Sequence, residues 1–186
     1  MRINMSRSWA MPNSNTFSIK PIKNLIKPYL VGKNVSQVVD PFVRNSPFKN
    51  LCISNDLDPD IDAQFHLDAL DFLKMFDDWK VDVVLFDPPY STRQVSECYR
   101  KLDKAVNMET TQSSFWTSLK REVGRIVAPN GICITCGWNS GGIGKTLGFN
   151  IEEILLVAHG GWHNDTIVTV EKKNKDALGQ GIYGDV

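Results

Sequence analysis

Residues 81–86, Val-Asp-Val-Val-Leu-Phe, restrict the fold of this chain more than any other segment. Five of these six residues are apolar, which is typical of a strand buried on both faces of a parallel sheet. The run stops at Asp87, and the two prolines that follow, Pro88 and Pro89, can continue neither a strand nor a helix. The segment therefore predicts a buried strand that delivers an acidic side chain to the edge of a sheet.

Other short apolar runs end on polar residues in the same way, and they alternate with stretches of helical spacing. The expected strands are residues 36–40, 51–54 and 131–136, and an antiparallel pair at 150–161 and 165–173. The expected helices lie near residues 20–30, within 63–79 with Asp68 as N-cap, and over 113–127. This alternation predicts an α/β fold, with a mostly parallel sheet, helices on its faces and a C-terminal antiparallel hairpin.

Length and composition indicate one globular domain over residues 1–186, of which 42% are hydrophobic. We expect a basic N-terminal arm and helix at 1–34, a loose tail at 174–186 and no separate domain for target recognition. No apolar run approaches the length of a membrane span, and no apolar segment follows the basic N-terminus. The expected location is therefore the cytoplasm.

The formal net charge is zero, but the charges are unevenly distributed. Residues 1–34 hold six basic residues and no acidic one, whereas residues 55–88 hold ten aspartates and two lysines. The first segment suits a surface that faces phosphates, and the second suits a site for a cationic ligand. A solvated surface without either role is the alternative.

Cys133 and Cys136 have the spacing of a redox or half-zinc motif, but they lie inside an expected strand. Residues three apart on a strand point to opposite faces, so the two thiols cannot share a metal ion. We therefore expect two buried cysteines and no metal site.

The tetrapeptide Asp87-Pro88-Pro89-Tyr90 has the composition of a site that holds an aromatic amine. Pro89 restricts the backbone of Pro88 and so fixes the direction of its carbonyl. An exocyclic NH2 group placed there would meet two acceptors, the Asp87 carboxylate and the Pro88 carbonyl, while Tyr90 offers a stacking surface. A rigid turn with an incidental tyrosine is the alternative.

Two further acidic positions follow expected strands at the edge where ligands bind in open α/β sheets. Asp40 ends the strand at 36–40, and Asn55 and Asp56 follow the strand at 51–54. A carboxylate at the second position can accept two hydrogen bonds from a ribose diol. Its alternative role is a local Asx-turn or a helix cap.

The Asp87–Tyr90 motif resembles the catalytic motif of the S-adenosylmethionine-dependent amino-methyltransferases, which methylate adenine N6 or cytosine N4 in nucleic acids. The resemblance covers most of the chain. Residues 17–30 look like the segment that closes over the cofactor, 38–42 like the start of the cofactor loop, 54–59 like the acidic end of the second strand, and 129–138 and 163–173 like the late strands. The implied fold is the Rossmann-like, seven-stranded class I methyltransferase sheet with a reversed last strand.

That resemblance also implies roles for individual residues. Asp87 and Pro88, supported by Pro89, would hold the target amino group, and Tyr90 would stack on a flipped base. S-adenosylmethionine would be the cofactor, and Asp68 would contact its adenine. The full set of expected cofactor contacts is Asp40, Pro41, Phe42, Arg44, Asn55, Asp56, Asp68 and Phe17. For Phe42 and Phe17, packing in the core is the alternative.

The cofactor loop departs from the family pattern Asp-Pro-Phe-x-Gly-Ser-Gly, because Arg44 and Ser46 stand where glycines belong. Only residues 41–50 separate the two strands, so the helix that usually follows the first strand must be a single turn or absent. No helix N-terminus would then receive the cofactor's carboxylate. Arg44 could replace it by a direct ion pair, or could be an unpaired surface arginine.

Substrate recognition is the least determined feature. Residues 91–112 hold basic side chains for phosphate contacts but few for base readout: Arg93, Arg100, Lys101 and Lys104. Low specificity, a single-stranded or RNA substrate, a homodimer and a recognition partner all stay open. His159, Trp162 and His163 lie in the expected hairpin turn, where they either line the base pocket or only form the turn.

The leading hypothesis is a DNA methyltransferase specific for adenine N6, with nucleic acid as its partner. RNA adenine N6 and DNA cytosine N4 are the alternatives within the class. A non-catalytic nucleic-acid-binding or interaction protein on the same fold is the alternative outside it.

Overall fold

The computed structural model describes residues 2–102 and 113–175, so the predicted tail beyond Lys175 and the basic Lys104 lie outside the described residues. The strands are β1 Asn4–Trp9, β2 Val38–Asp40, β3 Ile53–Ser54, β4 Val81–Phe86, β5 Val127–Gly137, β6 Phe149–Ala158 and β7 Thr166–Lys173. The α-helices are α1 Lys20–Leu30, α2 Ala69–Lys74, α3 Thr92–Lys101 and α5 Ser113–Ile126. Short 3-10 helices are η1 Thr16–Ser18, η2 Val35–Gln37, η3 Lys49–Leu51 and η4 Lys145–Leu147. No described helix combines the length and the apolar character that a membrane span requires.

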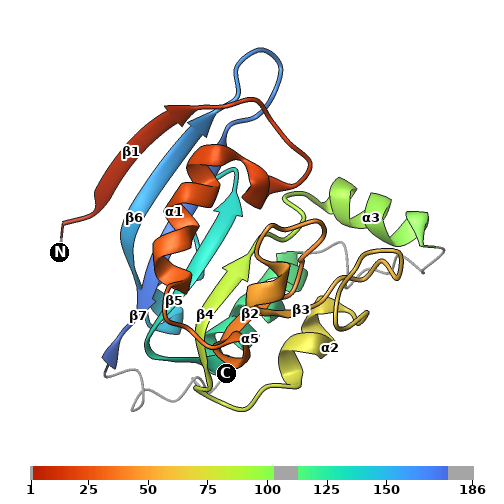
Figure 1. Cartoon of the computed structure of the whole chain (residues 1–186), viewed down its shortest axis with the longest axis vertical. Helices are drawn as coiled ribbons and strands as arrows, with labels where there is room; N and C mark the ends of the chain where they lie inside the picture. Colours follow the sequence, from red (N-terminus) through yellow and green to blue (C-terminus); the bar gives the residue numbers. More distant parts are fainter. Residues whose placement is uncertain (1, 103–112, 176–186) are drawn as a thin grey trace.

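The strands form one seven-stranded sheet in the order β1-β6-β7-β5-β4-β2-β3, with helices on both faces (Figure 1). β7 runs antiparallel to its neighbours β5 and β6, and the other neighbouring pairs are parallel. The predicted α/β fold with a mostly parallel sheet and a reversed last strand is therefore confirmed. The strands expected at 36–40 and 51–54 are shorter than predicted, because η2 and η3 occupy or precede their first residues.

The sheet separates two apolar layers. α1 covers one face through Ile22, Ile26 and Leu30, which recur every four residues and are buried. α2 and α5 pack on the opposite face. Cys133 and Cys136 lie in different layers, as predicted from their spacing on a strand.

β1 was not predicted from the sequence, which indicated only a basic arm. It pairs in parallel with β6, from Asn4 opposite Glu153 to Trp9 opposite Ala158. Its side chains are almost all exposed, so backbone hydrogen bonds hold this edge strand and no apolar run marks it in the sequence.

α3 was not predicted either, and it lies beside the ends of β2, β3 and β4 (Figure 1). Its N-cap is Ser91, whose hydroxyl accepts a hydrogen bond from the Gln94 amide. Val95 is its only buried residue, so its sequence lacks the apolar stripe that identifies a core helix.

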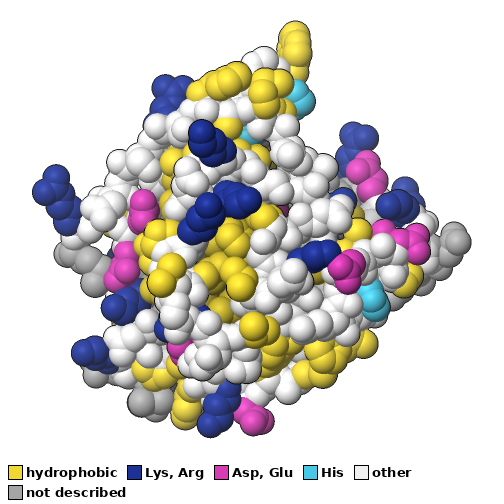
Figure 2. Space-filling model, in the orientation of Figure 1, with side chains coloured by type: hydrophobic (Ala, Val, Ile, Leu, Met, Phe, Trp, Pro, Cys, Tyr) yellow, Lys and Arg dark blue, Asp and Glu magenta, His cyan; other side chains and the backbone are white. Residues whose placement is uncertain are grey.

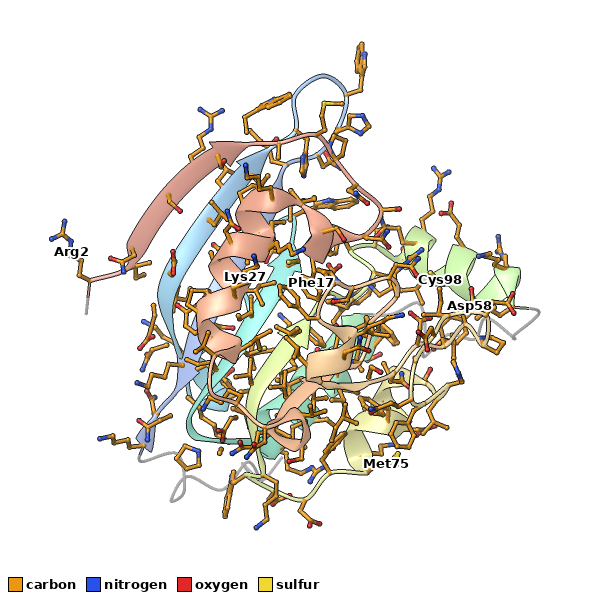
Figure 3. The ribbon with its side chains drawn as sticks, viewed as in Figure 1. Arg2, Phe17, Lys27, Asp58, Met75 and Cys98 are labelled. Carbon is orange, nitrogen blue, oxygen red and sulfur yellow. The ribbon has the colours of Figure 1, made fainter. Side chains whose placement is uncertain are left out.

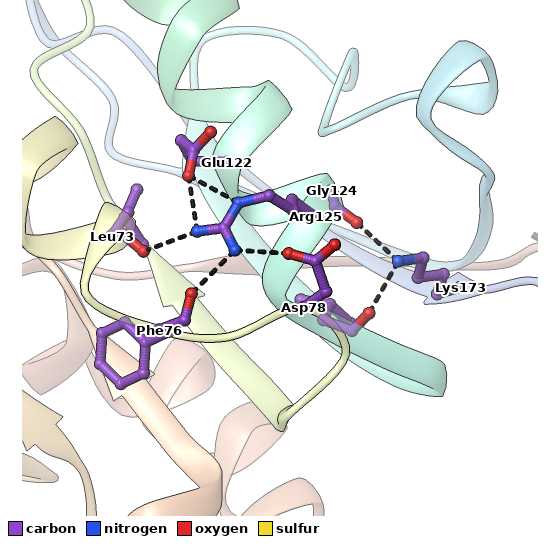
Figure 4. A network of polar contacts seen from close by, with 8 residues as sticks. Leu73, Phe76, Asp78, Glu122, Gly124, Arg125 and Lys173 are labelled. Atoms are coloured by element: carbon purple, nitrogen blue, oxygen red, sulfur yellow. Dashed lines mark hydrogen bonds and ion pairs between the residues drawn. The ribbon is translucent and has the colours of Figure 1, made fainter. Parts of the chain in front are cut away.

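A polar network fastens α5 to α2 near the start of β4 (Figure 4). The Arg125 guanidinium donates to the carbonyls of Phe76, at 2.8 Å, and Leu73, at 3.3 Å, and to the Asp78 carboxylate at 2.6 Å. Lys173 of β7 donates to the carbonyls of Gly124 and Val127, which belong to the last turn of α5 and the residue after it. α2 is thus held from its C-terminal end.

Candidate active site

A cavity of about 700 Å³ opens at the carboxyl ends of the strands. Its walls come from the loops after β2, β3, β4 and β5, the β6–β7 turn, the segment before η1, and α3. Ten of the twelve residues predicted as site residues line it: Pro41, Phe42, Arg44, Asn55, Asp56, Asp68, Asp87, Pro88, Pro89 and Tyr90. The topology therefore brings the predicted amine-holding motif and most of the predicted cofactor residues into one space.

Asp87 lies directly after β4, with its carboxylate oriented by neighbouring hydroxyls. The Tyr90 hydroxyl donates to Asp87 Oδ1 at 2.5 Å, and the Thr16 side chain also hydrogen-bonds the carboxylate. Burial raises the pKa of Asp87 above its ordinary value, and these two hydrogen bonds and the Arg44 charge oppose the rise. The result is a partly buried carboxylate held in one orientation.

The two prolines differ in what their carbonyls contact. The Trp116 indole N–H of α5 donates to the Pro89 carbonyl at 2.9 Å. No donor among the described residues reaches the Pro88 carbonyl. Pro88 therefore has an acceptor to offer beside the Asp87 carboxylate, which is the arrangement that the prediction requires, and Trp116 fixes the peptide that follows.

Tyr90 is fixed at three points. Besides its bond to Asp87, its amide donates to Gln94 Oε1 at 2.6 Å. Its ring packs edge-on against Trp138, with centroids 5.7 Å apart. The two rings form an aromatic wall beside the two acceptors, which suits a flat heteroaromatic ligand.

The loop after β2 contains no α-helix, and only the single turn η3 precedes β3, as predicted. Arg44 has φ +43°, a left-handed conformation that normally favours glycine. Its amide donates to Asp56 Oδ2 at 3.0 Å. The loop therefore keeps a glycine-like backbone at Arg44 and adds an exposed guanidinium at the cavity.

Asp40 does not line the cavity, which corrects its prediction as a cofactor contact. It is fully buried, and its Oδ1 accepts a hydrogen bond from the Phe42 amide at 3.0 Å. Its Oδ2 has no partner within the described part of the chain. Burial raises the pKa of Asp40 well above its ordinary value, and the charges of Asp87 and Asp56 add to the rise. Asp40 therefore holds the loop after β2 through its bond to the Phe42 amide and does not face the cavity.

Phe17 packs in the core against Phe48 and does not line the main cavity, but it lines a small adjoining cavity together with Phe42, Arg44 and Asp87, so its predicted contact with the cofactor stays a prediction. Figure 3 shows Phe17 beside α1, whereas Cys98 of α3 and Asp58 of the loop after β3 lie farther from this helix. Phe42 does line the cavity, and its ring packs edge-on against Phe86.

Asn55 and Asp56 have different surroundings. The Asn55 side chain is fully buried and bonds the Pro41 carbonyl and both backbone polar groups of Leu67. Asn55 therefore clamps two cavity loops together, and its side chain is not free to bind a ligand as predicted. Asp56 accepts amides from Arg44 and Asp58 and stays partly exposed to the cavity, so it forms the Asx-turn considered from the sequence and still offers lone pairs.

Asp68 caps α2, as predicted, by accepting the Leu70 amide at 2.9 Å. Its other carboxylate oxygen accepts the Tyr99 hydroxyl of α3. A second contact, from Lys101 to Asp58, also joins α3 to this wall. α3 is thus fastened over the part of the cavity formed by the loop after β3.

Both histidines of the β6–β7 turn line the cavity, and His159 in addition holds the turn in place. His159 is buried, and its ring bonds the Ala10 carbonyl at 2.8 Å and the Thr166 hydroxyl at 2.9 Å. It therefore holds the turn against the N-terminal segment. Trp162 and His163 are exposed and line the cavity.

Several residues that line or hold the site were not predicted as site residues, among them Thr16, Tyr99, Trp116 and Trp138. Trp138 follows a predicted strand on the edge that drew attention to Asp87, so the same reasoning would have found it. Tyr99 had no signal, because the helix that carries it was not predicted. Thr16 and Trp116 act through side-chain bonds between segments distant in sequence.

Comparison with known proteins gives a fold and no sequence family. No family model and no curated protein sequence matches the chain. TrmN from Thermus thermophilus superposes with a TM-score of 0.55 at 16% identity, over 83% of this chain and 49% of TrmN. The protein yhhF from Escherichia coli, assigned as a methyltransferase, superposes with a TM-score of 0.54 at 10% identity, over 88% of this chain and 90% of yhhF.

The fold is that of the Rossmann-like class I methyltransferases. This methyltransferase fold is shown by the superpositions and the strand order together. The chain spans about half the length of TrmN. Identities this low establish the architecture, and the activity has to be argued from the site.

Proposed function

We propose that the protein is an S-adenosylmethionine-dependent methyltransferase that acts on an exocyclic amino group of a nucleic-acid base, adenine N6 in DNA. The observation that carries this proposal is the pair of acceptors on adjacent residues, the Asp87 carboxylate and the Pro88 carbonyl, beside the ring wall of Tyr90 and Trp138. An NH2 group has two N–H donors, and this pair can accept both.

Each residue of the Asp87–Tyr90 motif would have a distinct role in methyl transfer. Asp87 and Pro88 would orient the amine so that its nitrogen lone pair faces the methyl donor. As the N–C bond forms, positive charge would develop on the nitrogen, and the negative Asp87, held in one orientation, would stabilise it. As the nitrogen takes the methyl group, the S–CH3 bond would break to leave a neutral thioether, and the surplus proton of the nitrogen would pass to the Asp87 carboxylate or to water, so no separate base is required before attack. S-adenosylmethionine, when bound, supplies an electrophilic methyl group on a sulfonium.

The described residues fit this cofactor in charge and in shape. Five carboxylates and two cationic side chains line the cavity, which suits a sulfonium: Asp56, Asp58, Asp68, Asp87 and Glu97 against Arg44 and Lys101. Leu57, Ile61 and Leu67 give the wall near Asp56 an apolar surface for an adenine ring. Asp56 would accept hydrogen bonds from the ribose hydroxyls of the cofactor. Phe42 and Arg44 would contact the rest of the cofactor, with Arg44 at its carboxylate.

Arg44 gives the first test, by calorimetric titration with S-adenosylmethionine. The wild-type protein is expected to bind it, and Arg44→Ala is expected to bind about tenfold more weakly, because a charged hydrogen bond to the carboxylate is lost. The effect should vanish for decarboxylated S-adenosylmethionine, which lacks that partner.

Two variants control for other causes. Arg93→Ala removes an exposed arginine of α3 that pairs with Glu97, and its affinity should match that of the wild type. Arg44→Gly removes the guanidinium but suits the positive φ, so recovery of affinity in this variant would show that the arginine is not the carboxylate ligand. Failure of the wild-type protein to bind the cofactor, even with nucleic acid present, would contradict the enzyme proposal.

A further inference from the structure

Exposed aromatic and apolar side chains lie on the β6–β7 turn, where Trp162 lines the cavity, and on the N-terminal segment beside this turn. Trp162 is fully exposed at the tip of the β6–β7 turn, and Trp9 and Met11 are 64% and 67% exposed. Figure 2 shows hydrophobic side chains gathered at the top of the molecule, where this turn lies in Figure 1. Trp162 and Trp138 both line the cavity, so this aromatic rim continues inward to the Tyr90 ring.

The rim is held in place by the fold. The Ala10 amide donates to the Ala158 carbonyl at 3.1 Å, and His159 bonds the Ala10 carbonyl. Gly160 and Gly161 both have positive φ and form the turn that precedes Trp162. The Trp9 indole nitrogen lies 3.4 Å from where a Cβ on Gly160 would stand, so Trp9 sits against the same turn. The N-terminal segment and the β6–β7 turn thus hold each other in place, and the exposed Trp9 and Trp162 project from them.

Cationic side chains continue from the rim over the adjacent surface. Arg7 is exposed two residues before Trp9 on the same side of β1. Lys20, Lys23 and Lys27 follow one another along α1, and Figure 2 shows Lys and Arg side chains over this helix below the apolar group. No ion pair within the described residues involves any of these four side chains.

We infer that the substrate is single-stranded DNA, with bases next to the target stacked on Trp162 and Trp9 and phosphates along Arg7 and the lysines of α1. This inference rests on the proposed function and specifies its substrate. A stacking platform with a cationic track is the combination that binds unpaired strands. Bases of a duplex expose only their edges to a protein surface, so an exposed indole gains no stacking from them unless the duplex is opened.

Binding is tested by fluorescence anisotropy with a labelled single strand, the duplex of the same sequence, and the RNA strand of that sequence. The single DNA strand is expected to bind at least about tenfold more tightly than the duplex. Trp162→Ala is expected to weaken single-strand binding about tenfold. Lys23→Ala should lower the slope of log K against log salt by about 0.7.

Trp79→Ala is the matched control, because Trp79 is exposed just before β4, at the opposite end of the sheet. Equal or tighter binding of the duplex, or an unchanged affinity in Trp162→Ala, would overturn the inference, and tighter binding of RNA would overturn the assignment to DNA. Titration with S-adenosylmethionine separates this result from the proposed function. If the protein prefers single strands through Trp162 but does not bind S-adenosylmethionine, the inferred single-strand binding stands and the proposed enzyme function fails.

Discussion

Asp87→Ala is expected to lower the rate of methyl transfer at least about 100-fold, with S-adenosylmethionine affinity nearly unchanged. The variant removes the charged acceptor that would stabilise positive charge on the nitrogen, and loss of one such group in a preorganised site typically has this magnitude. The Pro88 carbonyl and the ring wall remain, so substrate binding should weaken much less than the rate. Single-turnover transfer of labelled methyl, with parallel calorimetry, measures both quantities.

Asp82→Ala is the matched control for this prediction. Asp82 lies at the other end of β4, where it pairs with Lys33 at 2.8 Å, and its loss should leave the rate unchanged. Asp87→Asn keeps one acceptor oxygen and should fall between alanine and wild type. An unchanged rate in Asp87→Ala would show that the motif is only a rigid turn.

The pH dependence of the rate follows from the same residue. Only the ionised Asp87 supplies the charge, and its burial raises its pKa above the ordinary 3.8. The rate should therefore fall as the pH drops, with an inflection above the ordinary aspartate value, and Asp87→Asn should lack this inflection.

Gly142→Ala is expected to lower the free energy of unfolding by about 3 kcal/mol or more. Gly142 has φ +49°, and a Cβ there would lie 2.2 Å from a carboxylate oxygen of the buried Glu171. That carboxylate accepts the amides of Ile143 at 2.5 Å and Gly144 at 3.0 Å. The methyl group would break both bonds and leave a buried carboxylate without partners, as urea denaturation should report.

Gly32→Ala is the control that measures how much a positive φ alone lowers the free energy of unfolding when glycine is replaced by alanine. Gly32 has φ +75°, and apart from its two chain neighbours no described residue has an atom within 4 Å of where a Cβ on Gly32 would stand, so alanine there adds left-handed strain of about 1 kcal/mol and no clash. Equal destabilisation of the two variants would show that Glu171 does not hold the loop between β5 and β6.

The sequence predicted those elements whose residues pack in the core. β4 and α1 have the apolar spacing of buried elements, and the strand alternation followed from it. β1 and α3 were not predicted because their stability does not come from the burial of apolar side chains. β1 is an edge strand that needs only backbone partners, and α3 is fastened by its Ser91 cap and the Tyr99–Asp68 contact.

The site was predictable to the extent that it depends on strand ends. Placing an acid after each parallel strand identified Asp56 and Asp87, which meet in one cavity. That reasoning cannot say which way a side chain turns once the strand has ended. Asp40 and Asn55 turn inward and bond backbone amides or carbonyls, and this choice is made by loops that pack against each other from distant parts of the chain.

The most direct measurement of the central claim is transfer of labelled methyl from S-adenosylmethionine to unmethylated single-stranded DNA, followed by digestion to nucleosides and chromatography. Label is predicted in N6-methyldeoxyadenosine with the wild-type protein, and at background level with Asp87→Ala. Label in N4-methyldeoxycytidine would contradict the assignment to adenine. No labelled nucleoside from DNA or RNA, under conditions where the protein binds both cofactor and strand, would contradict the methyltransferase account itself.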